Sequence, residues 1–148
     1  MLPTIDQIIE NFDLIEDWEE RYNYIIELGR DLPPLPSELH TEANRVHGCE
    51  SQVWLDFRVA DAERLALRGD SDSMIVRGFV ALVIALYDGK TVADAAATDG
   101  LALFRKLDFG AHVTSKRANG IRAMIERIQR DSRNVRAPAP AAQEAPPV

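Results

Sequence analysis

Hydrophobic residues recur at helical spacing from the start of the chain. Isoleucines from Ile5 to Ile15 share one helical face with Phe12, and Thr4 and Gln7 just before them have the spacing of a capping box. We therefore predict a helix over about residues 5–16.

A second apolar stripe follows, and it continues through Tyr22 and Ile25. Asp17 and Glu20 repeat the capping signal at its start. Gly29 and the prolines of "DLPPLP" are predicted to stop this helix, because proline cannot continue one. The proline segment is interpreted as a rigid connector.

The pattern changes to strict alternation over residues 53–59, where every second side chain is apolar. Residues 64–70 alternate in the same way after a short turn, so the two runs predict an antiparallel hairpin with one buried face. Val46 and its neighbours are predicted to add a third, shorter strand.

Residues 74–86 are apolar almost all round, which is typical of a central buried helix. Asp70 or Ser71 is predicted to cap its start, and Asp88-Gly89 to end it.

Shorter helices are predicted over 92–97 and 101–107, and a last amphipathic helix over 115–133. Residues 1–134 are expected to form one domain. The Pro- and Ala-rich segment 135–148 has too little apolar bulk to offset the entropy of ordering, so we predict a disordered tail.

Composition and charge narrow the function classes. The 148 residues have a net charge of −7, which argues against general affinity for nucleic acid or for an anionic membrane. Acids dominate up to residue 38 and bases dominate residues 116–136, a pattern interpreted as two solvated helical faces. The start lacks a signal peptide and no apolar run is long enough to span a bilayer, so the expected compartment is the cytoplasm.

Candidate chemistry centres on Cys49, the single cysteine, which cannot form an internal disulfide. A lone cysteine is most often a small buried hydrophobe. Gly48 before it and the polar "ESQ" after it instead favour a loop, where a thiol can act as a nucleophile. Arg45 and His47 are close enough in sequence to stabilise the thiolate.

Other site types fit poorly. His47 and Cys49 have metal-ligand spacing and His40 and His112 are also present, but one thiol is too few for a structural zinc or an iron–sulfur cluster, so no metal is expected. "DGKT" at 88–91 lacks the first glycine of a P-loop, and no serine-hydrolase elbow occurs.

Several stretches together resemble the SufE-like sulfur acceptors of iron–sulfur cluster assembly. The match covers about residues 3–133, and its most specific part is a G-C-x-S-x-V-W string followed by G-D-S-D. The stretches are "WEERYNYIIELG", "VHGCESQVW", "LRGDSDSMIVRG", "ALYDG" and "HVTSKRANGIRAMIERI".

The resemblance implies an α+β fold, with a small antiparallel sheet and helices packed mainly on one face, like the cluster scaffold proteins of the pathway. It implies that Cys49 receives persulfide sulfur from a cysteine desulfurase of SufS or CsdA type, stimulates that enzyme, and passes the sulfur to an iron–sulfur scaffold. Pyridoxal phosphate would belong to the desulfurase, so no cofactor is expected on this chain. Which desulfurase branch is served, and whether the chain is a homodimer, stays open.

The resemblance also implies supporting roles around Cys49. His47, Gly48 and Ser51 belong to its loop, and Asp72 and Arg117 are candidates for partner docking or thiolate stabilisation. Lys116 stands where family members often carry serine, which removes any hydroxyl role there.

Two alternatives to sulfur relay remain at this stage. One is a thiol redox protein that uses Cys49 through a sulfenic acid, although a resolving cysteine is missing. The other is an interaction module without chemistry, which would use the acidic first helices and the basic last helix.

Overall fold

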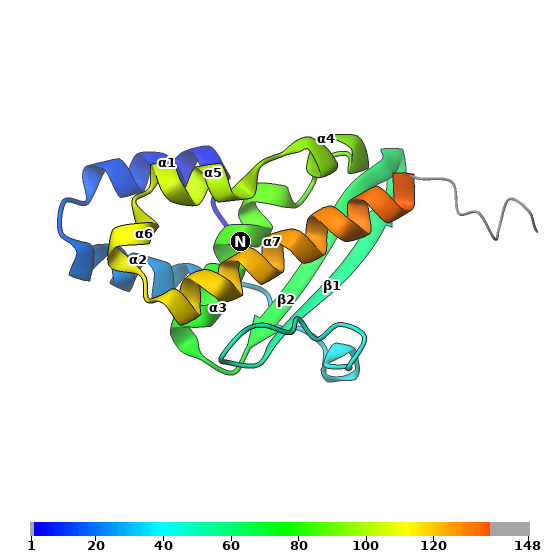
Figure 1. Ribbon diagram of the computed structural model, residues 1–148, viewed down its shortest axis with the longest axis horizontal. Coiled ribbons are helices and arrows are strands. Elements are labelled where there is room, and N and C mark those ends of the chain that lie inside the picture. Colours follow the sequence, from blue (N-terminus) through cyan, green and yellow to red (C-terminus); the bar gives the residue numbers. More distant parts are fainter. Residues whose placement is uncertain (1, 137–148) are drawn as a thin grey trace, which may run out of the picture.

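The computed structural model describes residues 2–136, which form an α+β fold of α-helices and a two-stranded antiparallel sheet (Figure 1). The α-helices are α1 (Ile5–Leu14), α2 (Trp18–Asp31), α3 (Met74–Tyr87), α4 (Val92–Ala97), α5 (Gly100–Lys106), α6 (Phe109–His112) and α7 (Ser115–Arg136). The strands are β1 (Val53–Ala60) and β2 (Arg64–Ser71), and short 3-10 turns occupy Ser37–Leu39 and Asp61–Glu63.

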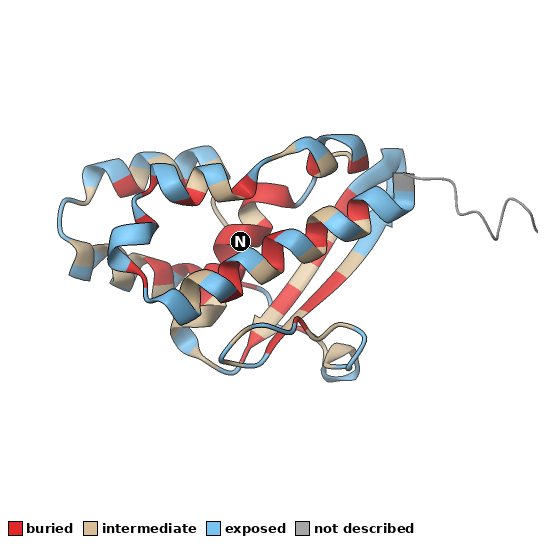
Figure 2. Cartoon of the chain, in the orientation of Figure 1, coloured by how far each residue is buried: buried red, intermediate tan, exposed pale blue. Residues whose placement is uncertain are grey.

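The predicted hairpin is confirmed, with Val53 paired to Ser71 at one end and Ala60 to Arg64 at the other. Helices α3 and α7 pack against the sheet, and the buried face includes Leu55 and Leu67. Residues 58–64, at the turn end of the hairpin, are exposed (Figure 2).

The third strand predicted around Val46 is wrong. This segment makes only an isolated bridge, in which Arg45 lies opposite Trp54 and the Val46 amide donates to the Val53 carbonyl at 2.9 Å. The chain turns away towards Cys49 directly afterwards, so the pairing cannot extend.

Helix α3 is the buried centre of the molecule, as predicted. Its cap is Ser73, whose hydroxyl accepts from the Val76 amide, so the predicted caps at Asp70 and Ser71 are wrong. Both of these residues are still paired in β2. Met74 is 61% exposed although it was counted with the buried face, because it lies in the first turn, beyond the core.

Gly29 does not stop α2, contrary to the prediction. It lies inside the helix, where α2 and α3 approach so closely that a Cβ on Gly29 would lie 2.8 Å from the Gly78 amide nitrogen. The helix ends at Asp31, just before the prolines. Gly29 and Gly78 are thus used for the close contact of two backbones.

Helix α7 runs three residues further than predicted, to Arg136. It therefore includes the first residues of the segment assigned to a disordered tail. Residues 137–148 of that segment lie outside the described part of the chain.

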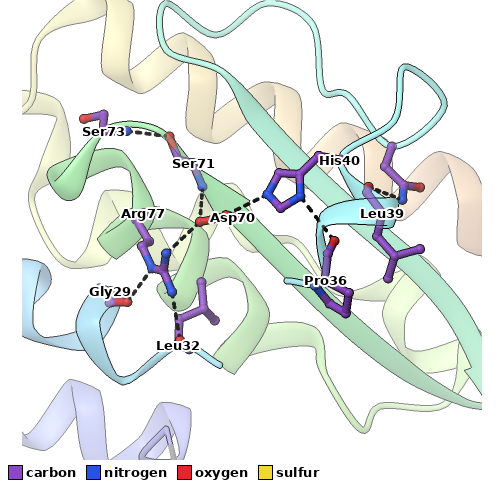
Figure 3. A network of polar contacts seen from close by, with 10 residues as sticks. Gly29, Leu32, Pro36, Leu39, His40, Asp70, Ser71, Ser73 and Arg77 are labelled. Carbon is purple, nitrogen blue, oxygen red and sulfur yellow. Dashed lines mark hydrogen bonds and ion pairs between the residues drawn. The ribbon is translucent and has the colours of Figure 1, made fainter. Parts of the chain in front are cut away.

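A polar network joins the end of α2, the proline connector and β2 (Figure 3). Arg77 of α3 donates to the Gly29 and Leu32 carbonyls at 2.8 and 3.0 Å and pairs with Asp70 at 2.8 Å. Asp70 also binds His40 Nε2 at 2.8 Å, while His40 Nδ1 lies 3.2 Å from the Pro36 carbonyl. Both His40 partners are acceptors, so the geometry favours the doubly protonated ring.

We expect Gly78→Ala to lower the free energy of unfolding by about 2–3 kcal/mol, because a packed interface resists an added methyl group. The new Cβ would lie 2.5 Å from Cγ2 of Ile25 and even nearer to its carbonyl oxygen. Urea denaturation measures the change. Gly110→Ala is the control, since nothing lies within 4 Å of its Cβ and the substitution should be close to neutral. A Gly78→Ala protein as stable as the wild type would show that the helix contact is dispensable.

The pKa of His40 is raised, chiefly by its hydrogen bond to Asp70. A raised pKa in the folded state means that His40 stabilises the protein fully below its ordinary pKa near 6.5, and that this stabilisation is lost as the pH rises through the raised value. Urea denaturation at pH 5.5 and 8.5 should show a loss of stability across this interval that is smaller in His40→Asn. An equal loss in both proteins would contradict the assignment.

Candidate functional site

The loop that carries Cys49 lies between the bridge at Arg45 and the start of β1. Gly48 has φ of +97°, in the left-handed region that glycine adopts without strain. At the far end, the Gln52 amide donates to the Asp72 carboxylate at 3.0 Å and the Asp72 amide donates to the Gln52 carbonyl at 3.3 Å. The loop is therefore fixed at both ends while its middle turns over α7.

Cys49 faces α7 at Gly120. Its thiol is half-buried, and Sγ lies 3.7 Å from the Gly120 carbonyl oxygen, to which it donates. A Cβ on Gly120 would lie 3.3 Å from Sγ, closer than most side-chain contacts. Gly120 thus leaves the space in which the thiol rests.

A cavity of about 290 Å³ opens beside the thiol. Phe79 of α3 and Met124 of α7 supply buried apolar wall, whereas the side chains of Lys116 and Arg117 bring positive charge. The remaining lining residues are Glu50, Ser51, Val76, Gly120 and Ile121. The thiol therefore faces a pocket that is apolar inside and charged along one side, where Glu50 pairs with Lys116 at 3.8 Å.

Burial raises the pKa of the Cys49 thiol, and the positive charge of Arg45 partly offsets this effect. Arg45 reaches over the Trp54 ring, with its guanidinium carbon 5.9 Å from the ring centre. In this conformation the resting thiol is mainly protonated at neutral pH, so it is stored as a weak nucleophile.

The structure brings some of the predicted site residues together and separates others. Ser51 and Arg117 line the cavity with Cys49. Asp72 instead holds the base of the loop, and exposed His47 turns away to pair with Glu42 at 2.6 Å. Trp54 of β1 packs edge-on against His40.

Sequence reasoning missed the residues of α3 and α7 that receive the loop. Phe79, Gly120 and Met124 were assigned only to helices, and Arg127 was noted only as a charge. Arg127 donates to the Ala43 and Arg45 carbonyls and so holds the segment before the loop. The one signal available in the sequence was Gly120 within the last helix. Glycine lowers the stability of a helix, so its presence there indicates that another group packs closely against it.

The three histidines lie apart from one another. His40 contacts Asp70, His47 contacts Glu42, and His112 stacks on Trp18. Within residues 2–136, no group of three or more His, Cys, Asp or Glu side chains is placed to hold a metal ion. In the same range, no helix combines the length and hydrophobicity needed to cross a membrane.

Comparisons with known proteins agree on one family. The model of the family described as "SufE: Fe-S metabolism associated domain" matches residues 6–132. A SufE-like protein of Rhizobium meliloti (strain 1021), named as uncharacterised, is 44% identical over 134 residues, covering 88% of this chain and 96% of the relative. A second one, from Rhizobium etli, is 45% identical over 141 residues, covering 93% and 95%.

A solved structure shares the fold. It is the solution structure of a hypothetical protein from Thermus thermophilus, with a TM-score of 0.72 over 90% of this chain and 97% of that one. The identity is 21%, so this likeness supports the architecture alone.

We expect Arg45→Gln to raise the pKa of Cys49 further, because it removes the charge that stabilises the thiolate. The rate of Cys49 alkylation by iodoacetamide, measured against pH, should shift to higher pH. Because Cys49 is the single cysteine, the measured thiol alkylation reports on this residue alone. Arg58→Gln, an exposed position in the hairpin, is the control and should leave the profile unchanged. An unshifted Arg45→Gln profile would show that Arg45 does not act on the thiol.

Proposed function

Because the chain belongs to the SufE family, which is associated with iron–sulfur metabolism, we propose that it is a sulfur acceptor and carrier that works through Cys49. It takes persulfide sulfur from a cysteine desulfurase, stimulates that enzyme by relieving it of its product, and delivers the sulfur to an iron–sulfur scaffold protein. The observation that carries the proposal is the half-buried thiol of Cys49 beside a cavity, on a loop in which Gly48 has a positive φ.

The chemistry is thiol–persulfide exchange. The Cys49 thiolate attacks the terminal sulfur of the desulfurase persulfide, a new S–S bond forms on Cys49, and the old S–S bond breaks. The desulfurase cysteine leaves with the electron pair as a thiolate and takes up the proton that Cys49 released. No net oxidant is needed, and the pyridoxal phosphate chemistry that makes the first persulfide would belong to the partner.

The cavity supports the carrier role between the two transfers. Its volume of about 290 Å³ exceeds what one added sulfur atom requires. Lys116 and Arg117 can offset the negative charge of a persulfide, and the walls of Phe79 and Met124 limit access of water.

Attack on a desulfurase requires the thiol to leave the surface of α7. The contacts that hold the thiol and its loop there are few. They are the long hydrogen bond from Cys49 to the Gly120 carbonyl, the packing around it, and an exposed ion pair between Glu50 and Lys116 at 3.8 Å. Gly48 can absorb the change in backbone angles, whereas the pairing of Gln52 with Asp72 keeps the strand end of the loop fixed. We propose that the loop swings outward about Gly48 when the partner binds.

Incubation with a cysteine desulfurase and free cysteine should add the mass of one sulfur atom to the protein, and reductant should remove it. Intact mass spectrometry measures this gain. Cys49→Ser should abolish both the gain and the stimulation of the desulfurase, whereas the matched loop variant Ser51→Ala should keep the gain. A wild-type protein that stays unmodified would overturn the proposal, and turnover of peroxide by Cys49 would favour the redox alternative instead.

A further inference from the structure

A second cleft lies further along α7, beside the segment that leads into the cysteine loop. Its volume is about 490 Å³. Basic side chains dominate its lining, and they come from both elements: Arg45 and His47 from the loop, and Arg127, Arg130 and Arg133 from α7. Gly48 lies where this wall meets α7, since a Cβ there would be 3.4 Å from Cβ of Ala123.

Acidic side chains in and beside the cleft compensate only part of this positive charge. Asp131 pairs with both Arg127 and Arg130, at 3.0 and 3.3 Å. Glu42 pairs with His47, and Glu126 is the one acid in the lining.

Two arginines of the cleft keep their charge available. Within residues 2–136, neither Arg45 nor Arg133 has an ion-pair partner. The Nε of Arg45 is also buried without a hydrogen-bond partner.

This basic region contrasts with a chain whose net charge is −7. The acids of α1 and α2 would repel an acidic partner, and the cleft would attract it. Such a field orients a partner before contact and raises its association rate. An acidic partner is thereby directed to the side of the molecule on which the cysteine loop meets α7.

We propose that this cleft docks an acidic segment of the cysteine desulfurase that supplies sulfur to Cys49; the assignment of that partner rests on the proposed function. The span from Arg127 to Arg133 is about 9 Å along the helix, at about 1.5 Å per residue. That is longer than one carboxylate or phosphate group reaches but suits several residues of an extended segment. Because Arg45 and His47 lie just before Gly48, the occupant touches the same loop that must move.

The first test uses Arg133→Glu and a purified cysteine desulfurase that the wild-type protein stimulates. The KM for this protein in sulfur transfer should rise about three- to tenfold with kcat unchanged, and the dependence of KM on salt should weaken. Arg122→Glu is the matched control, with the same change of charge at an exposed position of α7 outside the cleft lining, and its KM should stay within about twofold of the wild type. Alkylation of Cys49 by iodoacetamide should be the same in all three proteins. An unchanged KM in Arg133→Glu, or a fall in kcat instead, would overturn the proposal.

The second test needs no desulfurase and therefore separates failure of the cleft from failure of the proposed function. A hexaglutamate peptide is titrated into the ¹⁵N-labelled protein and followed by NMR. We expect chemical-shift changes at the backbone amides of residues 45–47 and 126–133. Arg133→Glu should weaken binding at least about threefold, and a hexaglutamine peptide should not bind. The proposal fails if hexaglutamate causes no shifts in the cleft, or if inorganic phosphate binds there as tightly as the peptide, since the site would then serve a small anion.

Discussion

The contact between α2 and α3 at Gly29 and Gly78 is the constraint on which the rest of the structure depends. No side chain separates the two backbones there, so neither helix can shift without opening a gap. Arg77 reinforces the contact by satisfying carbonyls at the end of α2. The position of α3 is fixed in this way, and α3 in turn supports the sheet and supplies Phe79 to the wall of the cysteine cavity.

Local patterns were sufficient to predict most of the secondary structure. The hairpin, the buried α3 and the amphipathic α7 each have a hydrophobic period that differs clearly from that of their neighbours. The errors arose where a residue serves a distant contact. Gly29 resembles a helix stop but accommodates α3, and Asp70 resembles a helix cap but pairs with His40 and Arg77. Sequence spacing does not distinguish these uses, because the deciding partner lies far away in the chain.

The same limit applies to the site. Cys49 and its loop were predictable because a lone thiol between glycine and polar residues is locally unusual. Apart from the glycine within α7, the surface that receives the thiol was not predictable, since Met124 follows the ordinary pattern of that helix and lies more than seventy residues away in sequence. The basic residues 116–136 were recognised as a charged helical face. Their division into the cysteine cavity and the second cleft depends on where the loop crosses the helix.

The raised pKa of Cys49 explains how the resting thiol can be protected and still serve in the proposed transfer of sulfur. Below the pKa of a thiol, each unit of increase lowers the thiolate fraction about tenfold, so the resting protein resists both oxidation and alkylation. Burial is the principal cause, and the proposed outward movement of the loop would relieve it. With less burial to oppose the positive charge of Arg45, the thiol would become a better nucleophile when the proposed partner binds. In this proposal, a thiol held against α7 by one long hydrogen bond would couple reactivity to docking without any second catalytic group.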